Sequence, residues 1–313
     1  MRQIGKKTIT LIITLLLITL AAFLAFQIIP GDPALSVLGM DATEQQIAAY
    51  RREMGLDQPL LIRYGTWVWN FIRGDLGQSY HYRTAVSGLL SDKLPVTLAL
   101  TAVSFLFIVI ISIPVGILMA KVADTRLGRM MNVANQTLMS IPSFFLGVLL
   151  ILIFGLILKW FTPGQYISYT DSITGFLGYL IAPAAAIAIP KSAMVMKFLR
   201  SSVLEQKRND YVRTAYSKGN TDNRVLFMHV LKNACIPVIT ILGMMIADTM
   251  AGSIVVEQVF NLPGVGRLLV ASIGNRDYPV VQAIIVYIAS TVVIVNFIVD
   301  VIYRLVDPRI RDV

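Results

Sequence analysis

The feature that most constrains this sequence is a series of apolar segments long enough to cross a lipid bilayer. A spanning helix needs about 20 mainly apolar residues, and its backbone polar groups must be satisfied internally. Six segments have this length: Thr8–Ile29, Pro95–Ala120, Asn132–Leu158, Phe176–Lys197, Asn233–Val256 and Pro279–Val301. The first three contain no charged side chain, and the others carry charges or prolines. The sequence therefore predicts an all-α integral membrane protein with six transmembrane helices.

Composition agrees with this interpretation. Hydrophobic residues make up 56% of the chain and charged residues 14%, whereas soluble domains have about 45–50% and about 25%. The net charge of +9 is carried between the apolar segments and not on a polar domain, which argues against nucleic-acid binding. The first segment has 22 residues, longer than the roughly 7–15 of a signal-peptide core. This length favours a retained helix over a cleaved signal.

The distribution of Lys and Arg predicts the orientation of the chain in the membrane. The two ends and the loops after the second and fourth segments hold 17 of them, whereas the two short loops on the opposite side hold three. Cytoplasmic loops are the basic ones, so both termini are predicted to be cytoplasmic. The long loop of residues 30–93 is then extracytoplasmic. Its aromatic run Tyr64–Phe71 and helical pattern at Glu44–Met54 predict a folded cap, which divides the chain into residues 1–94 and a five-helix transmembrane core of residues 95–313.

The most polar stretch, Arg200–Lys232, lies on the cytoplasmic side of this topology. Within it, residues 210–219 are predicted to form a short helix that stops near Gly219. Tyr211 and Ala215 are four residues apart and share a helix face. We interpret this face as exposed to the cytoplasm, where an apolar and aromatic helix face is suited to a groove on a partner.

The sequence Asp210-Tyr211-Val212-Arg213-Thr214-Ala215-Tyr216-Ser217-Lys218-Gly219 resembles the coupling loop of ABC importer permeases of the peptide and nickel branch. Arg213-Thr214-Ala215 stands where the older consensus has Glu-Ala-Ala. Six further motifs follow the order of that family: Gly31–Ala34, Met54–Leu60, Glu257–Gly266, Asn275–Pro279, Asn296 with Asp300, and Asp307–Arg311. Together they cover nearly the whole chain. It is thereby similar to the first permease subunit of dipeptide, oligopeptide and nickel importers.

This resemblance implies a type I permease fold and a set of partners. These are a second, homologous permease, two ATP-binding cassette subunits and an extracytoplasmic substrate-binding protein. The chain lacks a Gly-x-x-x-x-Gly-Lys-(Ser/Thr) phosphate loop, so ATP hydrolysis is assigned to the partner subunits and this chain is not an enzyme. The resemblance assigns ATPase coupling to Asp210, Tyr211, Arg213, Thr214, Ala215, Lys218 and Gly219. No bound cofactor or metal is predicted.

Three acidic residues in the membrane segments are candidates for the translocation pathway. A carboxylate at mid-bilayer costs about 2.5–3.5 kcal/mol on insertion scales. Asp248 is the most central, and it either lines the pathway or bonds a neighbouring helix. For Glu257 and Asp300, near helix ends, we favour packing or anchoring at the interface. For Lys191 we favour an ammonium that extends toward the cytoplasm.

Several alternatives remain open. The cargo is a peptide or, alternatively, nickel or a nickel chelate, with peptides favoured because they are the commoner cargo of the family. An ATP-independent channel or secondary transporter belongs to a different class, and it would leave the cytoplasmic helix unexplained. A membrane hydrolase is disfavoured because the sequence contains neither His-Glu-x-x-His nor Gly-x-Ser-x-Gly.

Overall fold

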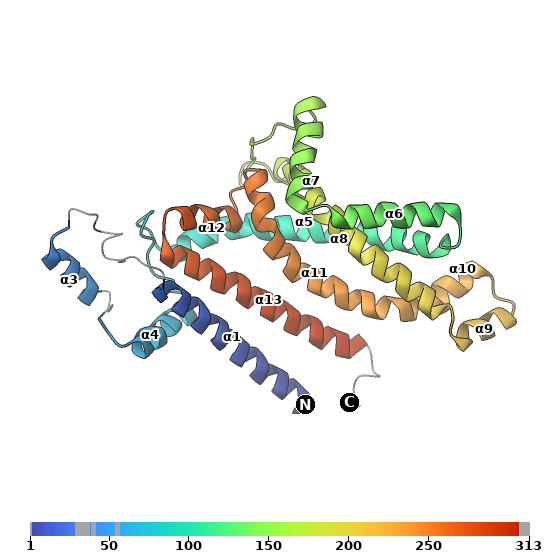
Figure 1. The fold of residues 1–313 in the computed structure, drawn as a ribbon, viewed down its shortest axis with the longest axis horizontal. Helices are drawn as coiled ribbons and strands as arrows, with labels where there is room; N and C mark the ends of the chain where they lie inside the picture. Colours follow the sequence, from blue (N-terminus) through green and yellow to red (C-terminus); the bar gives the residue numbers. More distant parts are fainter. Residues whose placement is uncertain (1, 29–37, 39–41, 54–56, 307–313) are drawn as a thin grey trace. The chain divides into compact units, whose positions relative to one another are not determined.

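The structure, a computed structural model, describes residues 2–28, 38, 42–53 and 57–306. Within these ranges the fold consists of helices, and the one β-type pairing is an isolated bridge between Gln78 and Ala85. The elements are α1 (Arg2–Ile28), α3 (Glu44–Glu53), α4 (Leu60–Ile72), α5 (Val86–Lys121), α6 (Arg126–Ser140), α7 (Ser143–Leu150), the π-helix η1 (Ile151–Ile157), α8 (Ile173–Gln206), α9 (Asp210–Ser217), α10 (Asp222–Val225), the π-helix η2 (Leu226–Val230), α11 (Leu231–Val259), α12 (Val265–Gly274) and α13 (Tyr278–Val306) (Figure 1). The all-α prediction is confirmed.

Five of the six predicted spans are confirmed as helices long and apolar enough to cross a membrane. They are Lys7–Phe26, Val86–Lys121, Ile173–Gln206, Asp222–Val259 and Tyr278–Val299. Three of them, Val86–Lys121, Ile173–Gln206 and Asp222–Val259, extend well beyond the apolar windows that the sequence marks, because their polar ends continue the same helical backbone. The fifth span, for example, runs unbroken through α10, η2 and α11.

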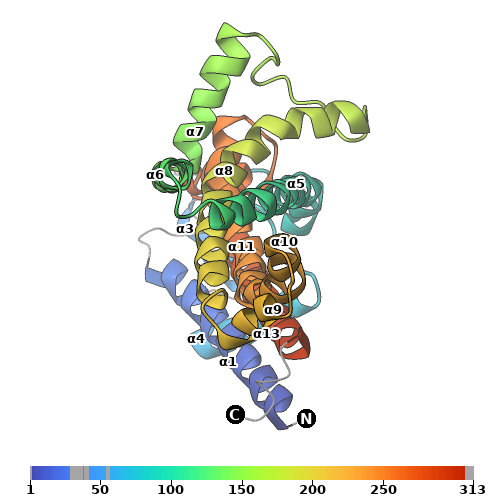
Figure 2. The same ribbon diagram turned by 90° about the vertical axis from the view of Figure 1, so that its right-hand side faces the viewer.

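The third predicted span, Asn132–Leu158, is wrong as one continuous helix. The chain bends by 97° between α6 and the segment Ser143–Ile157 (Figure 2). Ile141 has extended backbone angles, φ −82° and ψ 121°, and Pro142 follows it. A residue before proline is disfavoured in the α-helical region, and proline also lacks the N–H that a continuing helix would use. Pro183 and Pro190 nevertheless lie inside continuous α8, so a proline in the sequence did not by itself predict the break.

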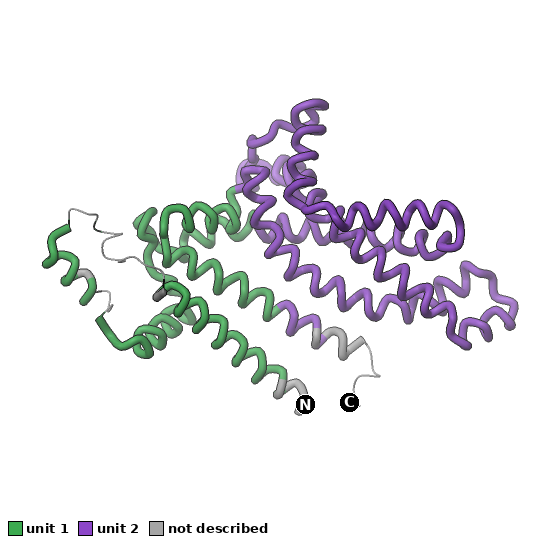
Figure 3. Tube along the Cα trace, in the orientation of Figure 1, with its two compact units in different colours: residues 1–96, 263–294 green, residues 97–262, 295–313 purple. Residues whose placement is uncertain are grey.

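The chain forms two compact units (Figure 3). Unit 1 comprises residues 1–96 and 263–294, and unit 2 comprises residues 97–262 and 295–313. The sequence-based division into residues 1–94 and 95–313 stays a prediction. What the sequence did not indicate is that residues 263–294 share a compact unit with the N-terminal part of the chain.

In unit 1, the aromatic residues of α4 pack on α1. Phe23 contacts the rings of Tyr64 and Trp67, with centroid distances of 5.5 and 6.0 Å. The Tyr64 hydroxyl also donates to the carbonyl of Leu16 at 3.1 Å. The loop after the first span is therefore folded against α1 in this region, as predicted. A separate apolar cluster joins the start of α5 to α12 and α13, with Val86 and Ile284 fully buried.

In unit 2, α8 is the central helix and packs against α6, α7 and α11. Glycines permit close approach of neighbouring helices, which is the usual packing mode in membranes. A Cβ added at Gly116 of α5 would lie 2.9 Å from Leu199 of α8, and one at Gly243 of α11 would lie 2.4 Å from Val299 of α13. The Asn135 amide donates to the carbonyl of Ala193 at 2.9 Å, tying α6 to α8.

Candidate functional site

The short helix α9 connects the two longest helices of unit 2. Ile173–Gln206 leads into it, and the span Asp222–Val259 follows it. The intervening segments, residues 207–209 and 218–221, are only turns. A displacement of α9 is therefore passed to two membrane-spanning helices through very little flexible chain.

The ends of α9 have clear local causes. Asp210 places an acidic side chain in the first turn, where it complements the positive end of the helix dipole. At the other end Gly219 has φ +78°, a conformation that glycine adopts without steric cost. Its N–H donates to the carbonyl of Tyr216 at 2.9 Å, and the N–H of Lys218 donates to Thr214 at 3.2 Å. The predicted stop at Gly219 is confirmed.

The apolar face of α9 lies against the protein and not against solvent. Val212 is 1% exposed and Ala215 is 5% exposed, and both belong to a core cluster with Leu199 of α8 and Val230 of η2. The expectation that Ala215 is exposed for a partner is therefore wrong. The physical reason is that the two apolar side chains fill the space between the ends of α8 and the fifth span, which leaves the amphipathic tyrosines outside.

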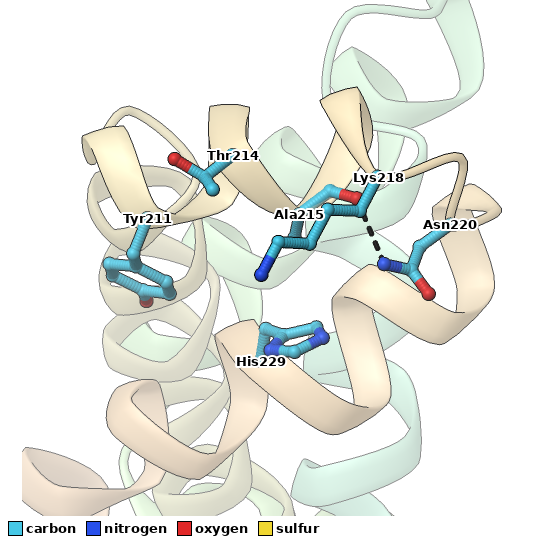
Figure 4. A pocket seen from close by; sticks show the side chains of 6 residues that line it. All are labelled: Tyr211, Thr214, Ala215, Lys218, Asn220 and His229. Carbon is cyan, nitrogen blue, oxygen red and sulfur yellow. Dashed lines mark hydrogen bonds between the residues drawn. The ribbon is translucent and has the colours of Figure 1, made fainter.

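A hollow of about 310 Å³ lies beside α9 (Figure 4). It is lined by Tyr211, Thr214, Ala215, Lys218, Asn220 and His229. The side-chain amide of Asn220 donates to the carbonyl of Ala215 at 2.9 Å and so fixes one wall. The hollow combines an aromatic ring, a hydroxyl and an ammonium, which are suited to hydrogen bonds and apolar contact with a protein surface.

The rim of α9 is exposed and polar. Tyr211 is 37% exposed, and its hydroxyl donates to the Gln206 side chain at 2.8 Å. Arg213 and Asp210 form a long, solvent-exposed pair at 3.8 Å. On the other side, partial burial and the Asp222 carboxylate raise the pKa of Tyr216 above its ordinary value. The Tyr216 phenol therefore stays protonated at physiological pH.

The structure describes the surroundings of two of the three candidate intramembrane carboxylates. Glu257 is completely buried and accepts a hydrogen bond from the Thr97 hydroxyl at 2.7 Å, an arrangement consistent with a role in helix packing. Asp248 is exposed and forms an ion pair with Lys191. Lys191 is thus paired with a carboxylate on α11, and its extension toward the cytoplasm stays a prediction. Asp300 lies in α13, and its side chain is outside the described part of the structure.

A fourth carboxylate, Asp277, was not recognised from the sequence although its motif Asn275–Pro279 was noted. It is completely buried at the junction of α12 and α13. It accepts hydrogen bonds from the Ser79 hydroxyl, from the N–H of Tyr80 at 3.0 Å and from the N–H of His81 at 3.3 Å. These donors are nearly 200 residues away in sequence, so local pattern carries no signal for the contact. The motifs Gly31–Ala34 and Asp307–Arg311 lie outside the described residues.

Comparison with known families identifies the architecture. Residues 112–312 match the family described as the inner membrane component of binding-protein-dependent transport systems, and residues 1–101 match the N-terminal family of such membrane components. The chain belongs to this permease family.

Several full-length relatives agree with that assignment. The permease is 37% identical over 310 residues to a putative peptide transport system permease protein of Brucella abortus, covering 98% of each chain. It is 38% identical over 309 residues to an oligopeptide transport system permease protein of Bacillus subtilis, again covering 98% of each. A glutathione transport system permease protein of Salmonella typhimurium is 36% identical over 306 residues, covering 98% of the permease and 97% of the relative.

Proposed function

We propose that the permease is one of two membrane subunits of an ATP-driven peptide importer, and that α9 couples it to an ATPase subunit. The observation that carries the proposal is the placement of Val212 and Ala215 in the same apolar cluster as residues of α8 and α11. Because close-packed cores transmit displacement instead of absorbing it, a force on α9 moves the ends of both helices. ATP-driven closure of the ATPase pair would thereby alternate access to the pathway.

We propose that the ATPase subunit contacts the permease at the hollow beside α9. Tyr211, Thr214 and Lys218 border it and are available for contact, while Ala215 forms part of its inner wall. Asp210 and Arg213 lie on the exposed rim and would steer the approach of the partner. Gly219 has a different role, since its φ of +78° ends the helix and fixes the direction of the following turn.

The proposed cargo is a peptide, and the proposed assembly includes a second permease, two ATPase subunits and an extracytoplasmic binding protein. The relatives belong to peptide, oligopeptide and glutathione transport systems, and their similarity extends over nearly the whole chain. The excess of Lys and Arg on one side supports an orientation with both termini in the cytoplasm of an inner membrane.

The test uses the complete transporter in liposomes. Tyr211→Ala is compared with Tyr216→Ala, since both tyrosines lie on α9 with exposures of 37% and 42% but only Tyr211 lines the hollow. We expect Tyr211→Ala to lower peptide uptake and peptide-stimulated ATP hydrolysis by about tenfold, as for a central aromatic contact of an interface. Tyr216→Ala should retain most activity. Full activity in both variants, or peptide uptake without the ATPase subunits, would overturn the coupling role.

A further inference from the structure

The ion pair between Lys191 and Asp248 lies deep within two long helices. Lys191 is more than ten residues from either end of α8, and Asp248 is more than ten residues from either end of α11. With a rise of about 1.5 Å per residue, both side chains start roughly 15 Å or more from the helix ends. Both helices extend beyond the predicted apolar segments Phe176–Lys197 and Asn233–Val256, within which Lys191 and Asp248 lie six and eight residues from the nearer end, still inside a bilayer core of about 30 Å.

The two members of the pair are exposed to very different extents. The Lys191 side chain is 15% exposed, whereas the Asp248 side chain is 62% exposed. The lysine stem passes beside Gly252. A Cβ added to this glycine would lie 3.8 Å from both Cε and Nζ of Lys191. The ammonium is thus held from within the helix pair and bonds Oδ2 of Asp248. The second carboxylate oxygen, Oδ1, makes no hydrogen bond within the described residues.

The face around Asp248 is otherwise apolar. Met244, Asp248, Ala251 and Val255 are exposed at helical spacing along α11. A carboxylate facing lipid at this depth costs about 2.5–3.5 kcal/mol on insertion scales. The face is therefore suited to a polar occupant inside the assembled transporter, which places it on the pathway if the proposed function holds. The inference below rests on that function.

An ammonium group is the occupant that this chemistry favours. The exposed end of the pair is the acceptor oxygen, while the donor, Lys191, is largely covered. A divalent cation prefers several oxygen ligands, and no group of three His, Cys, Asp or Glu side chains comes together in the described part of the chain. Met244, which is exposed on the same face of α11, is unbranched and adapts to varied apolar side chains. Because Lys191 already neutralises Asp248 in part, binding would be weak enough for release.

We propose that the exposed carboxylate of Asp248, held in place by Lys191, binds the side-chain ammonium group of a basic peptide in transit. The pair thereby favours peptides that carry a basic side chain over neutral peptides of the same shape. Asp248 is a specificity-determining residue in this proposal, and Lys191 is a positioning residue that orients the carboxylate.

The experiment measures uptake of Ala-Lys-Ala and Ala-norleucine-Ala by the complete transporter in liposomes. The same binding protein serves every variant, so its own preference cancels when ratios of uptake are compared between variants. Asp248→Asn keeps the shape and one acceptor oxygen but removes the charge. We expect it to lower the lysine-to-norleucine uptake ratio by about fivefold, as for one partly exposed charge pair. Asp124→Asn, an exposed carboxylate between α5 and α6, is the matched control and should leave the ratio unchanged.

An exchange of the two residues separates recognition from structure. Lys191→Asp combined with Asp248→Lys keeps an ion pair but presents the ammonium outward. We expect the preference to move toward Ala-Glu-Ala in this variant. An unchanged lysine-to-norleucine uptake ratio in either Asp248 variant, with ATP hydrolysis still stimulated by peptide, would overturn the role of the pair. It would leave the proposed function standing. Absence of peptide-stimulated hydrolysis in the unmodified complex would overturn the proposed function, and this inference with it.

Discussion

Asp277 and Asp248 are the same residue type in opposite surroundings. Asp277 is fully buried and accepts three hydrogen bonds from a loop distant in sequence, whereas Asp248 is mostly exposed and has one partner. A carboxylate with both oxygens hydrogen-bonded inside the protein stabilises the fold, and one with a free oxygen can bind something else. The comparison indicates which observation separates a structural carboxylate from a functional candidate. It is the presence of an accessible oxygen, more than the position of the residue within an apolar segment.

The largest expected effect comes from removing the buried member of the comparison. Asp277→Ala removes the carboxylate that accepts from the buried Ser79 hydroxyl and from two backbone N–H groups in part-buried surroundings. We expect a loss of roughly 3–5 kcal/mol in the free energy of unfolding, since unsatisfied buried donors cost about 1–3 kcal/mol each. Thermal unfolding of the detergent-purified complex measures this loss. A stability equal to that of the unmodified complex would show that Asp277 does not organise the loop.

An intermediate effect is expected at Glu257, which is buried but bonded by side-chain hydroxyls. Glu257→Gln keeps the size and one carbonyl oxygen near Thr97 while removing the charge. We expect a loss of about 2 kcal/mol, in line with hydrogen bonds to charged groups. The same unfolding measurement, with Thr97→Val as a partner variant, checks whether the two losses are less than additive. Full additivity would contradict direct coupling between the two side chains.

A smaller effect is expected when the exposed carboxylate is removed. Asp248→Ala leaves the Lys191 ammonium largely buried without its partner, so we expect a loss of about 1–2 kcal/mol, between the values for exposed and buried pairs. Comparison of its unfolding temperature with that of Asp277→Ala sharpens the contrast between the two aspartates. Equal losses of unfolding free energy in the two variants would mean that Asp248 contributes as much to the fold as Asp277 does, which would contradict the contrast between them.

The smallest effect is expected from the other half of the same pair. Lys191→Met leaves Asp248 unpaired but solvated, because its side chain is 62% exposed. We expect less than about 1 kcal/mol of destabilisation. We expect Asp248→Ala to be less stable than Lys191→Met, and thermal unfolding of the two variants checks this order. The reverse order would mean that Asp248 is buried in the assembled complex.

The sequence predicted the elements whose signal is local. The uncharged run Pro95–Ala120 marked α5, and the glycine at 219 marked the end of α9. It did not predict the break at Ile141, since prolines within α8 leave that helix continuous. It also missed α12, whose ten residues are too few to register as a span.

The candidate sites show the same limit. An eight-residue helix with two tyrosines, a valine and an alanine has more than one apolar face, so the sequence did not indicate that Val212 and Ala215 would be the buried pair. Asp248 was recognised because a charge in an apolar run is visible locally. Asp277 was missed because its three donors lie on another loop, and only the folded chain brings them together.

The Lys191–Asp248 pair also has a consequence for how the protein is made. The two residues are 57 positions apart, so at about 5–20 residues per second Lys191 is synthesised roughly 3–11 seconds before its partner. Its helix has the lowest mean hydropathy of the five candidate spans. During that interval the helix carries an unneutralised charge that opposes entry into lipid. We therefore expect α11 to assist the stable insertion of α8, since its carboxylate neutralises that charge only after the second helix has been made.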